Sequence, residues 1–227
     1  MASNALVRCF ALGLTVALAA CSSGADDGPG APTTESWTIG IYMAADNNLD
    51  RAATNDINEI LNAQVPENTS ALILVDRAEL GDYGGFGSIN GLEPHSTAKW
   101  LRITGNTLVE EEDLGEIDMA DPETVRLFLE RLAEEDVDRK AAVFWDHGSS
   151  FTFGGDDSAP FSRAMGVDEI ASQFREDPSD ESSPYRKVDI VGFDACLMSS
   201  VEALAEFNDA ADFFVASAEL EPGDGWD

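Results

Sequence analysis

The sequence has few thiols and few imidazoles for its 227 residues: three cysteines and two histidines. Cys9 and Cys21 lie near the N-terminus, so Cys196 is the single cysteine in the rest of the chain. Once the N-terminal leader is removed, Cys196 is left as the single free thiol. No intramolecular disulfide can then form, and the hydrophobic core must stabilise the fold alone. The small number of cysteines and histidines also limits the candidate catalytic residues. Cys196 is the one candidate thiol nucleophile, and His95 and His147 are the candidate bases.

Basic residues are scarce as well. Lysine and arginine total 13 against 44 aspartates and glutamates, which gives a formal net charge of −31. Nucleic acid is therefore excluded as a partner, because its recognition depends on clustered positive charge. The acidic excess keeps a protein soluble, and it also attracts cationic substrates or divalent ions.

The apolar run Cys9–Ala20 is too short to span a bilayer but has the length of a signal-peptide core. It leads into Leu-Ala-Ala-Cys21, which resembles the bacterial lipoprotein processing box. We expect residues 1–20 to be a lipoprotein signal peptide, Cys21 to be lipidated and residues 21–35 to be a flexible tether. The protein would then be held in the bacterial cell envelope by a lipid anchor in the membrane. An ordinary signal peptide cut at the same place is the alternative, and it would yield a secreted protein.

Residues 36–227 have the length of one domain with a hydrophobic core. Short continuous apolar runs, typical of strands buried on both faces of a parallel sheet, alternate with segments of helical periodicity. This alternation predicts an α/β three-layer sandwich. The expected strands are Trp37–Ala44, Ala71–Val75, Trp100–Ile103, Ala141–Trp145, Val188–Phe193 and Phe213–Ala216, and the expected helices are Leu49–Leu61, Pro122–Leu132, Val167–Phe174 and Leu197–Phe207.

His147 and Cys196 each follow an expected strand directly, Ala141–Trp145 and Val188–Phe193. Ligands of open α/β sheets bind beyond the carboxyl ends of the strands, so neighbouring parallel strands would bring imidazole and thiol together. Such a pair is the layout of a cysteine hydrolase, with the thiol as nucleophile and the imidazole as base. Gly148 would let the backbone approach a substrate and donate an N–H to a developing oxyanion, with the N–H of Cys196 as the second donor.

Other interpretations of these residues stay open on the sequence alone. A free cysteine often fills a core without reacting, and Cys196 would then be inert. If Cys196 is catalytic, a helix beginning there would favour its thiolate. His95 has no comparable context and is expected in a solvated loop. Asp146 directly precedes the candidate base, so its side chain is expected to point elsewhere and to have a structural role.

The run Asp46–Asp50 collects hard oxygen ligands of the kind that calcium prefers. It lacks the spacing of an EF-hand loop, and helix capping is the better explanation of its aspartates and asparagines. The sequence therefore predicts no metal site, and calcium is left without a clear site. No redox cofactor or nucleotide is implied, because the glycine-rich segment Gly81–Gly91 lacks the strand-to-helix context of a phosphate-binding loop.

Four segments carry a family resemblance: Trp37–Asp50 (WTIGIYMAADNNLD), Trp145–Ser149 (WDHGS), Phe193–Met198 (FDACLM) and Glu221–Trp226 (EPGDGW). In this order they resemble the clostripain-like cysteine peptidases, which are bacterial relatives of caspases, gingipains and legumain. The order and separation of the His-Gly and Ala-Cys pairs are also typical of caspase-type enzymes. The resemblance implies a caspase-like, mostly parallel sheet and a cysteine endopeptidase whose catalytic pair is His147 and Cys196.

The resemblance also implies a substrate, a polypeptide with arginine or lysine at P1, the residue that precedes the scissile bond. Asp194 and Asp224 match acidic residues that the family links to recognition of this side chain, and a carboxylate can pair bidentately with arginine. The alternative for Asp194 is a plain strand-end or capping role. Some relatives mature by self-cleavage. Arg163, in an exposed-looking segment between His147 and Cys196, is the expected site of such a cut.

Members of this family continue with further strand and helix beyond the segment that matches Glu221–Trp226, whereas this sequence stops at Asp227. We therefore expect a peptidase domain that is apparently truncated at the C-terminus. The alternative function is a catalytically inactive, cell-surface binding lipoprotein of the same fold.

Overall fold

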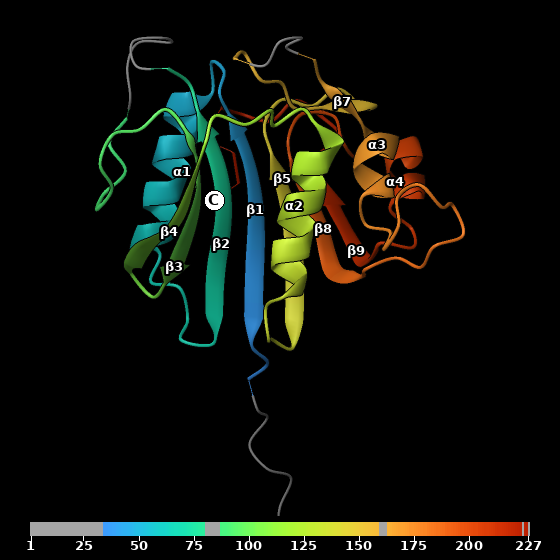
Figure 1. Cartoon of the computed structure of the whole chain (residues 1–227), viewed down its shortest axis with the longest axis horizontal. Coiled ribbons are helices and arrows are strands. Elements are labelled where there is room, and N and C mark those ends of the chain that lie inside the picture. The colour runs from blue at the N-terminus through green and yellow to red at the C-terminus, as the bar shows by residue number, and fades with distance from the viewer. Residues whose placement is uncertain (1–33, 80–86, 159–162, 224, 227) are drawn as a thin grey trace, which may run out of the picture. The chain divides into compact units, whose positions relative to one another are not determined.

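The computed structural model describes residues 34–79, 87–158, 163–223 and 225–226 (Figure 1). The expected signal peptide, the lipidation site Cys21 and the candidate specificity residue Asp224 lie outside the described residues. What the sequence predicts for them therefore stays a prediction. Within the described ranges, no helix is both long enough and apolar enough to cross a membrane.

A mixed sheet forms the centre of the fold. Its strands are β1 (Trp37–Ala45), β2 (Thr69–Arg77), β3 (Ala98–Thr104), β4 (Thr107–Gly115), β5 (Arg139–Trp145), β8 (Val188–Asp194) and β9 (Ala211–Ala216). In the part of the chain that the structure describes, these seven strands lie in the order β4-β3-β2-β1-β5-β8-β9. Strands β1, β2, β5, β8 and β9 are parallel, and β3 and β4 are added to one edge by antiparallel pairing. The prediction of a mostly parallel sheet is confirmed. A separate two-stranded sheet pairs β6 (Thr152–Phe153) with β7 (Met165–Gly166).

Helices cover both faces of the large sheet (Figure 1). They are α1 (Asp50–Asn62), α2 (Pro122–Ala133), α3 (Val167–Ser172) and α4 (Val201–Glu206). Strand β1 shows the two layers, because Ile41 and Met43 are buried with residues of α1, while Tyr42 and Ala44 are buried with residues of the other three helices. Successive side chains of a strand point to opposite faces, so both faces of β1 are buried. The predicted three-layer sandwich is confirmed.

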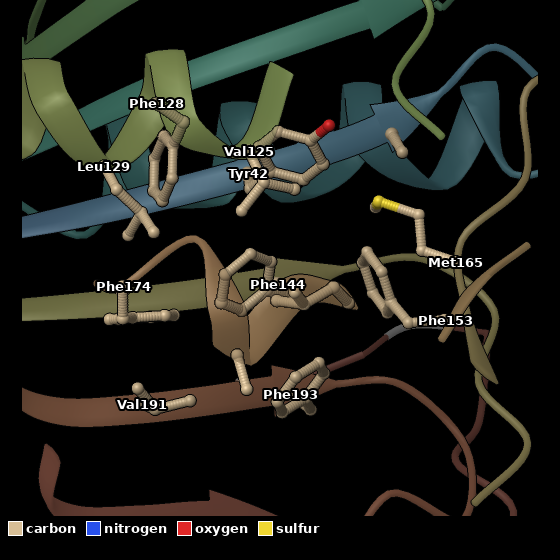
Figure 2. Close-up of a cluster of buried hydrophobic side chains, with 14 of the residues drawn as sticks. Tyr42, Val125, Phe128, Leu129, Phe144, Phe153, Met165, Phe174, Val191 and Phe193 are labelled. Atoms are coloured by element: carbon tan, nitrogen blue, oxygen red, sulfur yellow. The ribbon is translucent and has the colours of Figure 1, made fainter. Parts of the chain in front are cut away.

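Aromatic side chains fill the layer between the sheet and helices α2 and α3 (Figure 2). Phe144 of β5 stacks on Phe193 of β8 with ring centroids 5.1 Å apart, and Phe153 meets both rings edge-on. Offset-stacked and edge-to-face pairs are the favoured geometries of aromatic rings. Because Phe144 and Phe193 are the penultimate residues of their strands, this packing holds in place the two strand ends that precede the candidate catalytic residues.

The apolar pattern of the sequence misses β4. This strand reads Thr-Leu-Val-Glu-Glu-Glu-Asp-Leu-Gly and is mostly exposed at the edge of the sheet. Ion pairs help to hold it there, since Lys99 of β3 contacts both Glu110 and Asp113 at 2.8 Å. The apolar run Trp100–Ile103 does form a strand, but it pairs antiparallel with both of its neighbours. Continuous apolar runs therefore predict strands more securely than they predict the direction of pairing.

The helix expected over Leu197–Phe207 begins later than the sequence suggests. Helix α4 starts after Ser200, whose side chain accepts a hydrogen bond from the N–H of Ala203. Leu197 has a left-handed φ of 63°, which a non-glycine residue rarely adopts and which interrupts helical geometry. The expectation that a helix begins at Cys196 is therefore wrong, and with it the expectation that a helix N-terminus acts on its thiol.

Candidate active site

The parallel register of β5 and β8 places the two candidate catalytic residues at one edge of the sheet. Trp145 lies opposite Asp194, and His147 and Cys196 each follow two residues later. The backbone N–H of Asp146 also reaches the carbonyl oxygen of Asp194 at 3.4 Å, which extends the pairing past the strands. The two side chains line one pocket of about 220 Å³. Its other lining residues are Leu49, Trp145, Asp146, Asp194, Ala195, Glu221, Pro222, Gly223 and Gly225.

Cys196 is half-buried, and its sulfur contacts the backbone of Glu221. The N–H of Glu221 donates to Sγ at 3.3 Å, and the carbonyl oxygen of the same residue lies 3.9 Å from the sulfur. The backbone of Glu221 thus fixes the position of the sulfur at the edge of the pocket.

The His147 ring has a polar partner, Asn48, that no sequence motif indicates. Its Nε2 lies 3.0 Å from Oδ1 of Asn48, which follows the carboxyl end of the neighbouring strand β1. Desolvation lowers the pKa of His147 below its usual value, which favours the neutral imidazole that a general base requires. Position alone could have suggested Asn48, since it lies at the same sheet edge as His147.

The asparagines of the Asp46–Asp50 run do not cap a helix as expected. The N-cap position of α1 is Leu49, which makes no side-chain capping hydrogen bond. Asn47 Oδ1 instead accepts from the N–H of Leu49 at 2.8 Å, and its Nδ2 donates to Asp146 Oδ1 at 3.0 Å. The run therefore shapes the loop at the end of β1, and it does so through contacts with the segment around His147.

Gly148 allows the His147 loop to approach the Cys196 loop closely. A Cβ atom at this position would lie 2.5 Å from the carbonyl oxygen of Cys196 and 2.8 Å from Cγ of Met198. No side chain fits in that space unless the backbone shifts. The close contact between the His147 and Cys196 loops thus requires glycine at this position, and the oxyanion role of its N–H stays a prediction.

Replacing Gly148 with alanine is expected to separate these loops. We expect the substitution to lower the free energy of unfolding by about 1–3 kcal/mol, as overpacking does elsewhere, and to lower activity because Cys196 is displaced. Thermal unfolding and peptide hydrolysis measure the two effects. Gly155→Ala is the matched control, because a Cβ at Gly155 would meet nothing within 4 Å. Equal behaviour of the two variants would contradict this account of Gly148.

Asp194, the last residue of β8, lies beside a second acid, Glu221. Burial, together with the adjacent Glu221 carboxyl, raises the pKa of Asp194 to about 7. Trp226 connects the two acids, since its backbone N–H donates to Asp194 Oδ2 at 3.1 Å and its Nε1–H donates to Glu221 Oε1 at 2.9 Å. Gly225, with a φ of 61°, makes this turn possible, because a Cβ there would lie 2.9 Å from Asp194 Oδ2. The pocket therefore contains a pair of carboxyl groups, of which the sequence analysis identifies one.

Arg163, His95 and Asp146 differ in their surroundings. Arg163 is exposed and forms an ion pair with Glu169 at 2.9 Å. His95 is half-buried, its Nδ1 lies 3.2 Å from the carbonyl oxygen of Glu93, and burial lowers its pKa, so the expectation of a solvated residue is wrong. Asp146 is buried, and burial raises its pKa well above the usual value. Its bond to Asn47 fits the structural role expected of it.

The chain is similar to known proteins in both sequence and fold. The family model described as "Clostripain family" matches residues 41–227. Clostripain of Hathewaya histolytica is 27% identical, and the match covers 83% of this chain and 40% of clostripain.

Two solved structures share the fold. A secreted C11 cysteine protease from Bacteroides thetaiotaomicron, in complex with an irreversible peptide inhibitor, superimposes with a TM-score of 0.65 at 22% identity. An inactive zymogen C11 protease from Parabacteroides distasonis gives a TM-score of 0.60 at 21% identity. The matches cover 85% and 86% of this chain but 51% and 52% of those proteins, so the chain spans about half their length. On the extent of the family match, this chain belongs to the clostripain family.

Proposed function

We propose that this chain forms the catalytic part of a cysteine endopeptidase in which Cys196 is the nucleophile and His147 the general base. The observation that supports the proposal most is the shared pocket of His147 and Cys196, with a backbone N–H of Glu221 directed at the sulfur. Asn48 holds the imidazole from the side of β1. Nucleophile, base and orienting group therefore occupy one sheet edge.

The proposed reaction proceeds in two stages. The imidazole of His147 takes the thiol proton, and Sγ of Cys196 forms a bond to the scissile carbonyl carbon. The carbonyl oxygen then carries negative charge, and the N–H groups of Gly148 and Cys196 are the proposed donors to it. The C–N bond breaks as His147 gives the proton to the leaving amine, and a thioester remains. Water, deprotonated by His147, attacks this thioester and releases the acid product and the free thiol.

The proposed preference is for arginine or lysine at P1. Asp194 and Glu221 line the pocket beside the thiol. A cationic side chain between them would offset the burial and the effect of Glu221 that together raise the pKa of Asp194. Asp224, outside the described residues, is proposed as a further acid of this subsite. A pair of carboxyl groups in a half-buried pocket disfavours acidic side chains and favours basic ones.

Fluorogenic peptides that differ only at P1 test this function. We expect hydrolysis of the arginine and lysine peptides and much slower hydrolysis of the alanine and glutamate peptides. The alternative, an inactive binding lipoprotein, predicts hydrolysis of none of them. A preference for glutamate would contradict the assigned subsite.

Self-cleavage is proposed to occur after Arg163. This residue is exposed and lies between His147 and Cys196 in the chain. Of the competing basic residues in that interval, Arg175 and Arg186 are partly buried, and Lys187, although exposed, directly precedes strand β8. Exposed segments are where nicking concentrates. We expect N-terminal sequencing of the active protein to find a second chain that begins at Ala164. The new terminus should be absent from Cys196→Ala. A fully active protein with one intact chain would refute the cut.

We further propose that Cys21 carries a lipid and holds the protein on the cell envelope. Stable attachment requires more than one acyl chain, which a lipidated N-terminal cysteine provides. Cys21→Ser is expected to move the protein from the membrane fraction to the soluble fraction, and quantitative immunoblotting of the two fractions measures this. Cys9→Ser is the matched control and should leave the fractionation unchanged. If Cys21→Ser stays with the membrane, an ordinary signal peptide becomes the better interpretation.

A further inference from the structure

A buried carboxylate on helix α1 binds a tryptophan of the pocket that contains Cys196. Asp56 is buried, and its Oδ2 accepts a hydrogen bond from the indole Nε1–H of Trp145 at 2.7 Å. Trp145 is the last residue of β5 and lies two positions before His147. The bond joins residues that are 89 positions apart, so it ties helix α1 directly to the strand end that carries the proposed base.

The Trp145 ring lies where two hollows of the surface meet. Trp145 and Asp194 line both the pocket of Cys196 and a neighbouring cavity of about 360 Å³. Asp56 lines this second cavity, whose other walls are mostly apolar side chains. The indole of Trp145 therefore belongs to the wall between the two hollows, and Asp56 contacts that wall from the side of the cavity.

The sheet places Asp194 directly beside this tryptophan. Trp145 and Asp194 are partners in the parallel register of β5 and β8, so their side chains emerge on the same face of the sheet. A second tryptophan, Trp226, donates its backbone N–H to Asp194. Each of the two indole N–H groups is bound by another acid, Asp56 for Trp145 and Glu221 for Trp226. Asp56 thus holds one side of the Asp194 site as Glu221 holds the other.

Asp56 also acts on Asp194 through its charge. Burial and Glu221 are the larger causes of the raised pKa of Asp194, and the negative charge of Asp56 adds to them. Because Asp56 is buried, solvent screens its charge less than that of an exposed acid. The ionisable groups that line the two hollows with Asp194 are Asp56 and Glu59 from α1, Asp146 and His147 after β5, Cys196 after β8, and Glu221.

We propose that Asp56 is a positioning residue of the P1 subsite, which holds the Trp145 ring beside Asp194 and adds a negative charge behind that ring. The inference rests on the proposed function for the identity of the substrate. A cationic P1 side chain that pairs with Asp194 would lie in the field of Asp56 without touching it, because the attraction between opposite charges extends over several ångströms in a half-buried site.

Two substitutions separate the bond from the charge. Asp56→Asn keeps an oxygen that can accept from the Trp145 N–H but removes the charge. At pH 8 we expect it to lower kcat/KM for an arginine-P1 peptide by about 3- to 10-fold and to leave an alanine-P1 peptide within about twofold of the wild type. Asp56→Ala removes the acceptor as well, so the ring is released and hydrolysis of both peptides should fall. Steady-state kinetics with the two peptides measure these effects.

A titration of Asp194 gives a readout that a purely structural bond would not change. The carboxyl carbons of isotope-labelled aspartate can be followed by NMR, and the Asp194 signal is the one missing from Asp194→Asn. In Asp56→Asn its titration midpoint should fall by about half a pH unit, because one neighbouring negative charge is removed. Glu59→Gln is the matched control. It removes an exposed acid of the same helix that lines the same cavity, and it should leave the midpoint unchanged.

The outcomes distinguish this inference from the proposed function. A wild type that hydrolyses neither peptide would refute the proposed function, whereas the titration needs no hydrolysis and still decides whether Asp56 acts on Asp194. An unchanged midpoint in Asp56→Asn, or an equal shift in Glu59→Gln, would overturn the role of Asp56. Equal losses on the arginine and alanine peptides in Asp56→Asn would likewise overturn it, since they would indicate damage to the fold.

Discussion

Cys196→Ala is expected to lower kcat/KM for an arginine-P1 peptide by a factor on the order of 10⁴–10⁶, because covalent catalysis ends when the nucleophile is removed. The fold should persist. The sulfur is half-buried, and its loss leaves the N–H of Glu221 without an acceptor, at a cost of about 1 kcal/mol. Steady-state kinetics and thermal unfolding of the same preparation measure the two effects separately.

Two histidine variants serve as the matched controls for this experiment. His147→Ala should lose activity to a similar extent, because nucleophile and base act as a unit. His95→Ala removes the other imidazole, which lies outside the pocket of Cys196, and should keep most of the activity. A Cys196→Ala protein that retains substantial hydrolysis would refute the proposed mechanism. Equal losses in the two histidine variants would point to damage to the fold and not to catalysis.

Asp194→Asn is expected to weaken cleavage after arginine by about 30- to 150-fold, which corresponds to the loss of a charge-assisted hydrogen bond worth roughly 2–3 kcal/mol. The amide keeps an oxygen that can accept the hydrogen bond from the N–H of Trp226, so the loop should stay in place. An alanine-P1 peptide provides the control, because its hydrolysis needs no negative charge in the pocket. Equal losses on both peptides would remove Asp194 from the specificity site.

The pH dependence of Asp194 gives this prediction a second readout. Because burial and Glu221 raise its pKa to about 7 in the folded protein, it is largely protonated below neutral pH. For the free enzyme, kcat/KM on the arginine peptide should therefore rise as pH increases through about 7, and Asp194→Asn should lose that rise. A raised carboxyl pKa favours the folded state below the unfolded value near 4 and loses that contribution by pH 7. The variant should accordingly be at least as stable as the wild type at pH 8.

Much of the fold can be predicted from the sequence, because it depends on local patterns. Continuous apolar runs mark the buried strands, and Asp121 followed by Pro122 marks the start of α2, where the Asp121 side chain accepts from the N–H of Glu123. The apolar pattern does not predict an element correctly where the element is only partly buried or where a turn interrupts the helical periodicity. Strand β4 is a polar edge strand, and the left-handed turn at Leu197 delays α4. Neither feature produces an apolar periodicity in the sequence.

Local sequence patterns are enough to predict that a thiol and an imidazole each follow a strand, and that parallel neighbouring strands would place both at one edge of the sheet. The groups that surround the thiol and the imidazole depend on the folded chain. Asn48 at the imidazole, the Glu221 N–H at the sulfur and the convergence of Asp76 with three other acids join segments far apart in the chain. Hydrophobic periodicity specifies which face of an element is buried, but side-chain convergence depends on strand order, register and loop paths. For that reason the sequence of Asp46–Asp50 suggests a helix cap, whereas in the folded chain the Asp46 carboxylate lies in a cluster of four acids.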